Sequence, residues 1–188
     1  MIIQYLKSFN IFTDEQIEEF IDLTTKKNIK KNSLFVEEDT VNKQVAFIDT
    51  GIFRSYYTNM NGDEITYCFR YPGELLAAYS SYITGQKSVE NLQAITDSTL
   101  TVITKQNLEN LINKHQSWLI FSKITAEQQY LELEQRIFQL QKTSAKDRYE
   151  LLFKKQPEYI KELPLNYLAS YLGISQRHLS RIRREISF

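Results

Sequence analysis

The chain has very little of the side-chain chemistry that marks several large classes of protein. Its 188 residues include one cysteine, Cys68, and two histidines, His115 and His178. A single cysteine excludes an intrachain disulfide framework and any cysteine-ligated metal or iron–sulfur centre within one chain. The two histidines lie in different predicted helices and form no metal cluster, so we expect no metal and no cofactor.

Glycine, proline and long apolar runs are also scarce. The chain has 5 glycines and 3 prolines, and 13% of its residues are aromatic, which favours packed cores over disorder. No apolar run approaches twenty residues, and no basic-then-apolar signal precedes the first helix. We therefore expect a cytoplasmic protein of two compact units that does not associate with membranes.

The net charge of zero hides an uneven distribution along the chain. Residues 1–141 hold 13 Lys and Arg against 18 Asp and Glu, net −5, whereas residues 142–188 hold 10 against 5, net +5. Local positive potential attracts a polyanion whatever the overall charge. The distribution predicts a nucleic-acid partner for the C-terminal part, although charge can also segregate by chance.

Residues 163–186 contain two predicted helices joined by a turn. The first has an apolar face made of Leu165, Leu168, Ala169 and Leu172. It is expected to end at Gly173, because glycine readily adopts the left-handed conformation of a helix terminus. Ser175 is a suitable N-cap for the second helix, which has Leu179, Ile182 and Ile186 on its buried face. This pattern predicts a helix-turn-helix.

The opposite face of the second helix has the residue types that contact DNA. Arginine forms a bidentate contact with guanine, glutamine forms one with adenine, and both also reach phosphates. We expect base contacts from Gln176, Arg177 and Arg181, and backbone contacts from Ser175, His178, Ser180 and Arg184. The sequence ends at Phe188, so we expect no full wing after this helix. The alternative is an ordinary helical hairpin with a solvated basic face.

The N-terminal part has the pattern of a small β domain preceded by two short helices, residues 2–9 and 14–23. Strands are predicted at residues 33–36, 45–49, 52–58, 64–71, 92–96 and 100–103. Asn61-Gly62 predicts a tight hairpin between two of them. An antiparallel barrel or jelly roll fits this spacing. Aromatic side chains of the strands are expected in the core or at a dimer face, with a ligand cage as the alternative.

A long helix is predicted over about residues 117–142. Its proposed dimer face is formed by Phe121, Ile124, Gln128, Leu131, Gln135 and Phe138, at alternating steps of three and four. A homodimer would supply two recognition helices for a palindromic DNA site. Packing of the helix on its own β domain is the alternative. The expected segments are 1–115, 116–142 and 143–188.

This arrangement resembles the CRP/FNR superfamily of bacterial transcription regulators over nearly the whole chain. The matching stretches are VAFIDTG at 45–51, NGDE at 61–64, YPGE at 71–74 and LASYLGISQRHLSRIRRE at 168–185. The resemblance implies an α+β protein. It would have a cyclic-nucleotide-binding-like jelly roll, a long dimerisation helix and a C-terminal helix-turn-helix.

The ligand cassette implied by that resemblance is altered. Family members that bind cyclic AMP place a Glu on the ribose and an Arg on the cyclic phosphate. The corresponding positions here are Ala77-Ala78 and Ser88-Val89-Glu90, so both charged residues are missing. Glu90 would repel an anion, and we predict no useful affinity for cyclic AMP. Tyr79 and Tyr82 either fill the altered pocket or border an unidentified small-molecule effector.

The leading interpretation is a homodimeric, sequence-specific transcription regulator that binds double-stranded DNA. RNA polymerase is a further candidate partner. The alternative is a ligand-binding or protein-interaction module whose helix-turn-helix no longer engages DNA. An enzyme is the weakest interpretation, because metal chemistry in a jelly roll needs a histidine and carboxylate cluster, and no histidine precedes His115.

Overall fold

The computed structural model describes residues 1–157 and 160–186, and it divides into two compact units. Unit 1 comprises Met1–Tyr57 and Cys68–Ala126, and unit 2 comprises Thr58–Tyr67 and Glu127–Phe188. The boundary between the units lies inside the long helix, between Ala126 and Glu127. The segments expected from the sequence instead had their boundaries at the two ends of this helix. The expectation of a missing wing concerns the chain after residue 186, which lies outside the described residues.

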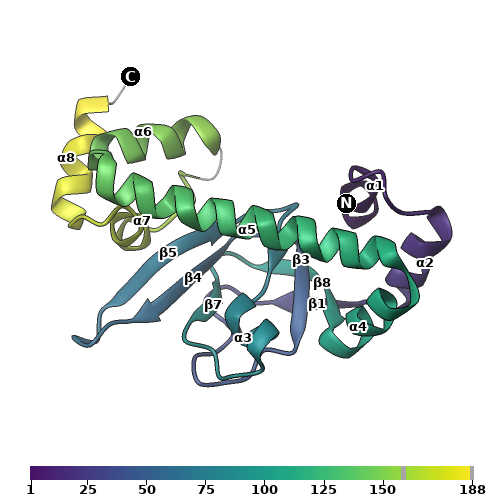
Figure 1. Cartoon of the computed structure of the whole chain (residues 1–188). Coiled ribbons are helices and arrows are strands. Elements are labelled where there is room, and N and C mark those ends of the chain that lie inside the picture. Colours follow the sequence, from purple (N-terminus) through teal and green to yellow (C-terminus); the bar gives the residue numbers. More distant parts are fainter. Residues whose placement is uncertain (158–159, 187–188) are drawn as a thin grey trace. The chain divides into compact units, whose positions relative to one another are not determined.

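The described residues form eight helices and eight strands (Figure 1). The helices are α1 (Ile2–Lys7), α2 (Asp14–Asp22), α3 (Tyr79–Thr84), α4 (Lys105–Lys114), α5 (Gln116–Lys142), α6 (Ala145–Lys155), α7 (Leu165–Leu172) and α8 (Gln176–Ile186). The strands are β1 (Thr25–Ile29), β2 (Leu34–Val36), β3 (Gln44–Thr50), β4 (Phe53–Thr58), β5 (Glu64–Arg70), β6 (Leu75–Leu76), β7 (Asn91–Ala94) and β8 (Ser98–Thr104).

The strands form two four-stranded sheets with the orders β1-β8-β3-β6 and β2-β7-β4-β5. The β1–β8, β3–β8, β3–β6, β2–β7 and β4–β7 pairs are antiparallel. Both sheets contribute apolar side chains to one core, among them Ile48 and Leu100 from the first sheet and Phe53 and Leu92 from the second. This confirms the predicted antiparallel β domain.

A second apolar cluster of unit 1 lies on the other face of the first sheet. Phe47 and Ile103 pack there against α1, α2, α4 and the start of α5. Trp118 is fully buried in this cluster, and its ring stacks on that of Phe20 at 4.8 Å between centroids. The N-terminal helices therefore cover the face of the sheet that the β core leaves open.

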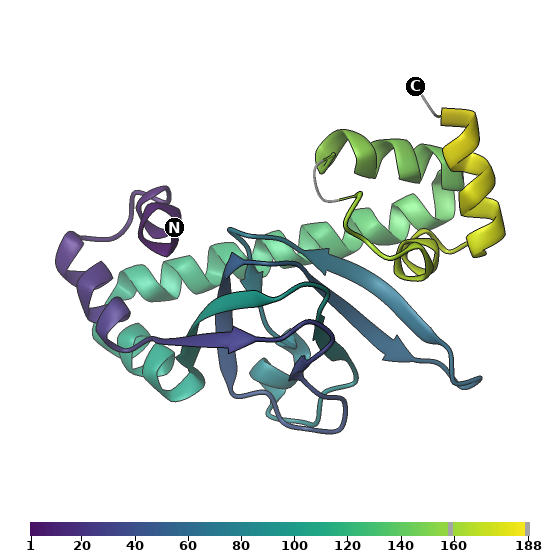
Figure 2. The same cartoon turned by 180° about the vertical axis from the view of Figure 1, so that it is seen from behind.

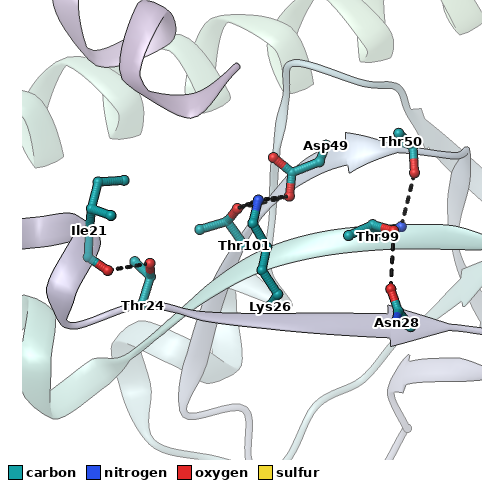
Figure 3. A network of polar contacts seen from close by, with 8 residues as sticks. All are labelled: Ile21, Thr24, Lys26, Asn28, Asp49, Thr50, Thr99 and Thr101. Atoms are coloured by element: carbon teal, nitrogen blue, oxygen red, sulfur yellow. Dashed lines mark hydrogen bonds and ion pairs between the residues drawn. The ribbon is translucent and has the colours of Figure 1, made fainter.

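A polar network ties β1, β8 and β3 together on that face (Figure 3). The Nζ of Lys26 lies 2.8 Å from Oδ2 of Asp49 and 2.7 Å from Oγ1 of Thr101, and the Thr101 hydroxyl donates to the same Asp49 oxygen at 2.8 Å. Asp49 lies two residues from Phe47, so both side chains point to the same face of β3. The network fixes the register of β1, whose residues are otherwise mostly exposed.

The predicted hairpin between β4 and β5 is confirmed by their adjacency in the second sheet. Positive φ occurs at Gly62 (85°) and not at Asn61, so the loop is not a two-residue turn with both central residues left-handed. The side-chain oxygen of Asn59 instead accepts from the amides of Asn61 and Asp63, both at 2.9 Å. The loop is therefore longer and is organised by Asn59.

Helices α6, α7 and α8 enclose the core of unit 2, seen from behind in Figure 2. Its buried apolar residues are Tyr149, Ile160, Leu163, Leu168, Ala169, Leu172, Leu179 and Ile182. Ser144 caps α6 in a capping box with Asp147, and its hydrogen bonds lower the pKa of the Asp147 carboxyl.

Candidate nucleic-acid interface

The turn between α7 and α8 has the geometry that the sequence predicted. Gly173 ends α7 with φ 69° and ψ 34°. Its amide donates to the carbonyl of Ser170 at 3.0 Å, and the amide of Ile174 donates to the carbonyl of Ala169 at 3.0 Å. This pair of bonds is a Schellman motif, which needs a left-handed residue at the position of Gly173.

Helix α8 begins with a side-chain cap and packs along one face. The hydroxyl of Ser175 accepts from the amide of His178 at 3.2 Å, which confirms Ser175 as the N-cap. Leu179 and Ile182 are buried, and Ile186 is half-buried. This face fixes the rotation of α8 about its axis, so the opposite face is directed to solvent.

The exposed face of α8 contains most of the residues expected to contact DNA. Those that are exposed are Ser175, Gln176, Arg177, Arg181 and Arg184, whereas His178 and Ser180 are half-buried. The Ser180 hydroxyl donates to the carbonyl of Gln176 at 2.9 Å. Arg181 lies 3.9 Å from the Glu185 carboxylate, at a site where both side chains are mostly exposed, so this weak pair leaves its guanidinium accessible.

Sequence reasoning assigned no role to Ser170, Arg136 or Arg148. Ser170, in the last turn of α7, bonds to the backbone of β5, and the two arginines donate to carbonyls of the same turn. Their partners are mostly backbone carbonyls from distant parts of the chain. Backbone carbonyls have no sequence signature, so no residue pattern could have located these contacts.

The outer half of α5 exposes two apolar stripes. Of the predicted dimer-face residues, Gln128, Leu131, Gln135 and Phe138 are exposed, Ile124 is half-buried, and Phe121 is buried in the aromatic cluster of unit 1. A second stripe, unnoticed in the sequence, is formed by Tyr130, Leu133, Ile137 and Leu140, which are between 45% and 65% exposed. Its steps of three, four and three are those of a heptad seam, and all four members are apolar.

The predicted effector segment is bonded to the neighbouring loop of unit 1. Ser88 is 2% exposed; its amide donates to the carbonyl of Thr40 at 2.7 Å, and its hydroxyl donates to the carbonyl of Glu90 at 2.7 Å. Glu90 and Ala78 are also buried, Ala77 is half-buried, and Val89 is exposed. Three of these five positions, Ala78, Ser88 and Glu90, are thus shielded from solvent.

Tyr79 and Tyr82 lie together on α3, next to this segment. Their rings stack with centroids 6.3 Å apart and an interplanar angle of 11°. Burial raises the pKa of Tyr82 to about 12, with smaller contributions from Glu109 and Tyr79. The Nζ of Lys105 lies 5.1 Å from the Tyr82 ring centroid, which adds a cation–π contact.

Arg54 on β4 is a buried cation that the sequence did not single out. It is 1% exposed, its Nε donates to Oε1 of Gln93 at 2.8 Å, and its guanidinium lies 3.9 Å from the centre of the Tyr56 ring. A buried charge is tolerated when it is bonded and stacked in this way. Arg54 therefore anchors β4 to β7.

Part of the chain is similar in sequence to a known protein family. Residues 26–115 match the family model of the cyclic nucleotide-binding domain. No curated protein is similar enough in sequence to give a match. The matched segment runs from β1 to the end of α4.

Solved structures extend the match to nearly the whole chain. FixK2 from Bradyrhizobium japonicum is similar with a TM-score of 0.77 and 17% identity, over 87% of this chain and 84% of that chain. A putative transcriptional regulator of the CRP/FNR family from Eubacterium rectale gives 0.73 and 16%, over 97% and 87%. CLP from Xanthomonas campestris, a c-di-GMP responsive global regulator, gives 0.66 and 13%, over 93% and 91%. The chain therefore has the fold of these solved structures, as the resemblance drawn from its sequence implied.

Two of these structural neighbours are regulators, one described as a putative transcriptional regulator and the other as a global regulator. No helix in the described part of the chain is long and apolar enough to span a membrane.

Proposed function

We propose that this chain is a sequence-specific, DNA-binding transcription regulator of the CRP/FNR type. The observation that carries the proposal is the exposed face of α8, where Gln176, Arg177 and Arg181 project from a helix that is capped and buried on its other side. Side chains of these types, held on a rigid helix, match the donor and acceptor pattern of base edges in the major groove. Ser175 and Arg184 flank them as candidate phosphate contacts.

The active form in this proposal is a homodimer that pairs through α5 and binds a palindromic site. The four side chains of the second stripe are about half exposed, and apolar surface in water is unfavourable. Pairing with α5 of a second copy would bury this surface. We place the seam on Tyr130, Leu133, Ile137 and Leu140, because Gln128 and Gln135 weaken the stripe predicted from the sequence.

Sedimentation analysis distinguishes the two seams. The double variant Leu133→Asp, Ile137→Asp should be monomeric at micromolar concentration, whereas the matched variant Leu131→Asp, Phe138→Asp should remain dimeric. The reverse result would assign the dimer to the stripe predicted from the sequence. Two dimeric variants would contradict pairing through α5.

We further propose that cyclic AMP is not the effector. The segment that would hold it has alanines and Ser88 where charged ligand residues are expected, and Ser88 and Ala78 are buried. A cyclic phosphate would lose its charge-assisted partner there.

Selection of bound fragments from the source genome, followed by gel shift at several salt concentrations, tests the DNA-binding proposal. Enrichment of a shared palindromic site, with affinity that falls steeply as salt rises, is the expected result. Retention of no fragment at low salt would favour the alternative of a module that no longer engages DNA.

A further inference from the structure

The last turn of α7 is held by three different elements through three consecutive residues. Ser170 is bonded to β5, Tyr171 to α5 and Leu172 to α6. All of these groups belong to unit 2. Gly173 follows at once, and α8 begins three residues later at Gln176.

The contact of Ser170 satisfies two backbone groups of an edge strand. β5 is the last described strand of its sheet, so one side of it has no neighbour among the described strands. The Ser170 hydroxyl donates to the carbonyl of Glu64 at 3.1 Å and accepts from the amide of Thr66 at 2.9 Å. A single hydroxyl thus makes the two backbone hydrogen bonds that one residue of a neighbouring strand would make.

The contacts of Tyr171 and Leu172 come from two arginines. Arg136 on α5 donates to the Tyr171 carbonyl and stacks its guanidinium 3.8 Å from the centre of the Tyr171 ring. Arg148 on α6 donates to the Leu172 carbonyl at 2.8 Å. These carbonyls lie at a helix C-terminus, where cations are favoured by the helix dipole.

Arg148 also joins the end of α5 to this turn. Its Nη1 donates to the carbonyl of Gln139 at 3.3 Å and to the carbonyl of Thr143. One planar guanidinium therefore connects the last turn of α5, the α5–α6 junction and the last turn of α7. A lysine has the same charge but lacks the fork geometry that reaches several acceptors at once.

We propose that Ser170 and Arg148 are positioning residues that set the orientation of α8 for DNA binding. This inference rests on the proposed function. Arg148 lies in the basic part of the chain, where a phosphate contact is the obvious role, but its guanidinium is committed to three carbonyls. Ser170 lies on α7, away from the exposed face of α8. Neither residue reads or neutralises DNA in this proposal, so both act by holding the turn that precedes α8.

The test uses the full chain and the operator obtained by fragment selection. Arg148→Lys keeps the charge and removes the fork, and it should weaken operator binding about tenfold. Ser170→Ala should weaken it about threefold. In both variants the slope of log affinity against log salt should be unchanged, because no phosphate contact is lost. The matched controls, Lys146→Arg on the exposed side of α6 and Ser122→Ala on α5, should bind like the parent.

Hydrogen exchange of the DNA-free protein supplies a readout that does not depend on DNA. Ser170→Ala should speed exchange of the Thr66 amide, and Arg148→Lys should speed exchange at Gly173 and Ile174, with little change in unit 1. Unchanged exchange, or a salt slope reduced by about one when Arg148→Ala removes the charge altogether, would overturn the positioning role. If the parent binds no DNA, the proposed function fails, and the exchange rates still decide whether these contacts hold the turn.

Discussion

Polar side chains are buried and hydrogen-bonded around the predicted effector segment of unit 1, whereas they are exposed on the outer face of α8. Ser81 and Ser88 are buried, and their hydroxyls bond to nearby backbone carbonyls. Gln176, Arg177 and Arg181 are exposed, and Arg181 has only a weak partner at the surface. The resemblance to CRP/FNR regulators implies recognition of an anion at both places.

The difference bears on which of the two expected recognition surfaces is free to bind a ligand. A polar group that is already bonded inside the protein must be released before it can bind a ligand, which costs free energy. An exposed arginine on a rigid helix carries no such cost beyond desolvation and side-chain ordering. The contrast therefore supports the two proposals, that DNA is the polyanionic partner and that a cyclic nucleotide does not bind in the segment around Ser88. Substitutions in both units test this contrast, from the largest expected effect to the smallest.

Gly51→Ala should destabilise unit 1 most strongly. An added Cβ would lie 1.9 Å from Oγ and 2.8 Å from Cα of Ser98, and the backbone has φ +93°. Overpacking and backbone strain together should lower the free energy of unfolding by about 3 kcal/mol, measured by denaturant titration. Gly62→Ala, with φ +85° and open space, is the matched control and should cost clearly less. Equal losses would show that the contact with Ser98 does not matter.

Arg177→Ala should weaken binding to the selected operator by about 1 to 3 kcal/mol and relax specificity at one base pair. The reason is loss of a bidentate base contact, and fluorescence anisotropy with mutated operators measures it. Lys30→Ala, which removes one exposed charge from unit 1, should leave affinity unchanged. If Arg177 and Arg181 can both become alanine without effect, α8 is not the reading helix.

Gly173→Ala and Gly85→Ala compare the two units directly. Both glycines end a helix at nearly the same φ, 69° and 71°, and an added Cβ makes no close contact at either position. Each substitution should cost about 1 to 2 kcal/mol of stability from left-handed strain alone. Only Gly173→Ala should also reduce operator affinity, because it moves the start of α8. A similar loss of affinity in Gly85→Ala would contradict the separation of roles.

Ser144→Ala should cost about 1 kcal/mol by removing the N-cap of α6. The same change should raise the pKa of Asp147 toward its ordinary value, because Ser144 supplies the hydrogen bonds that lower it. A lowered pKa stabilises the folded state above the unfolded-state pKa, and this stabilisation is lost as pH falls through the folded-state value. NMR titration of the carboxyl tests the assignment, and an unchanged pKa would refute it.

The elements that local chemistry specifies were predictable from the sequence. Ser175 caps the helix that was expected to follow it, and Gly173 ends the helix that was expected to precede it. Strand β1 was missed, because four of its five residues are exposed and alternation is absent. Its register depends on Lys26 contacting Asp49 and Thr101, residues remote in sequence.

The candidate site also has parts that could be predicted from the sequence and parts that could not. The outward face of α8 follows from helical periodicity, and five of the seven residues expected to contact DNA are exposed, whereas His178 and Ser180 are half-buried. Arg148 was read only as part of a basic segment, because nothing in a sequence distinguishes an arginine bonded to carbonyls from one that awaits a phosphate. The second stripe of α5 overlaps in sequence with the predicted one, and burial of Phe121 in unit 1 became evident only from the aromatic packing of the fold.

Addition of cyclic AMP should cause no measurable change in the thermal stability of the protein. This is the smallest of the expected effects. A ligand with micromolar affinity for the folded state adds about 4 kcal/mol at about 1 mM, which a thermal shift assay detects easily. We expect no shift, and we expect Ser88→Arg to lower stability instead of creating a site, because residue 88 is 2% exposed and its hydroxyl and amide are both bonded. Val89→Arg, at an exposed neighbouring position, is the matched control and should be neutral. A saturable shift in the parent would mean that unit 1 has rebuilt an anion site from other residues, and the contrast with α8 would then be wrong.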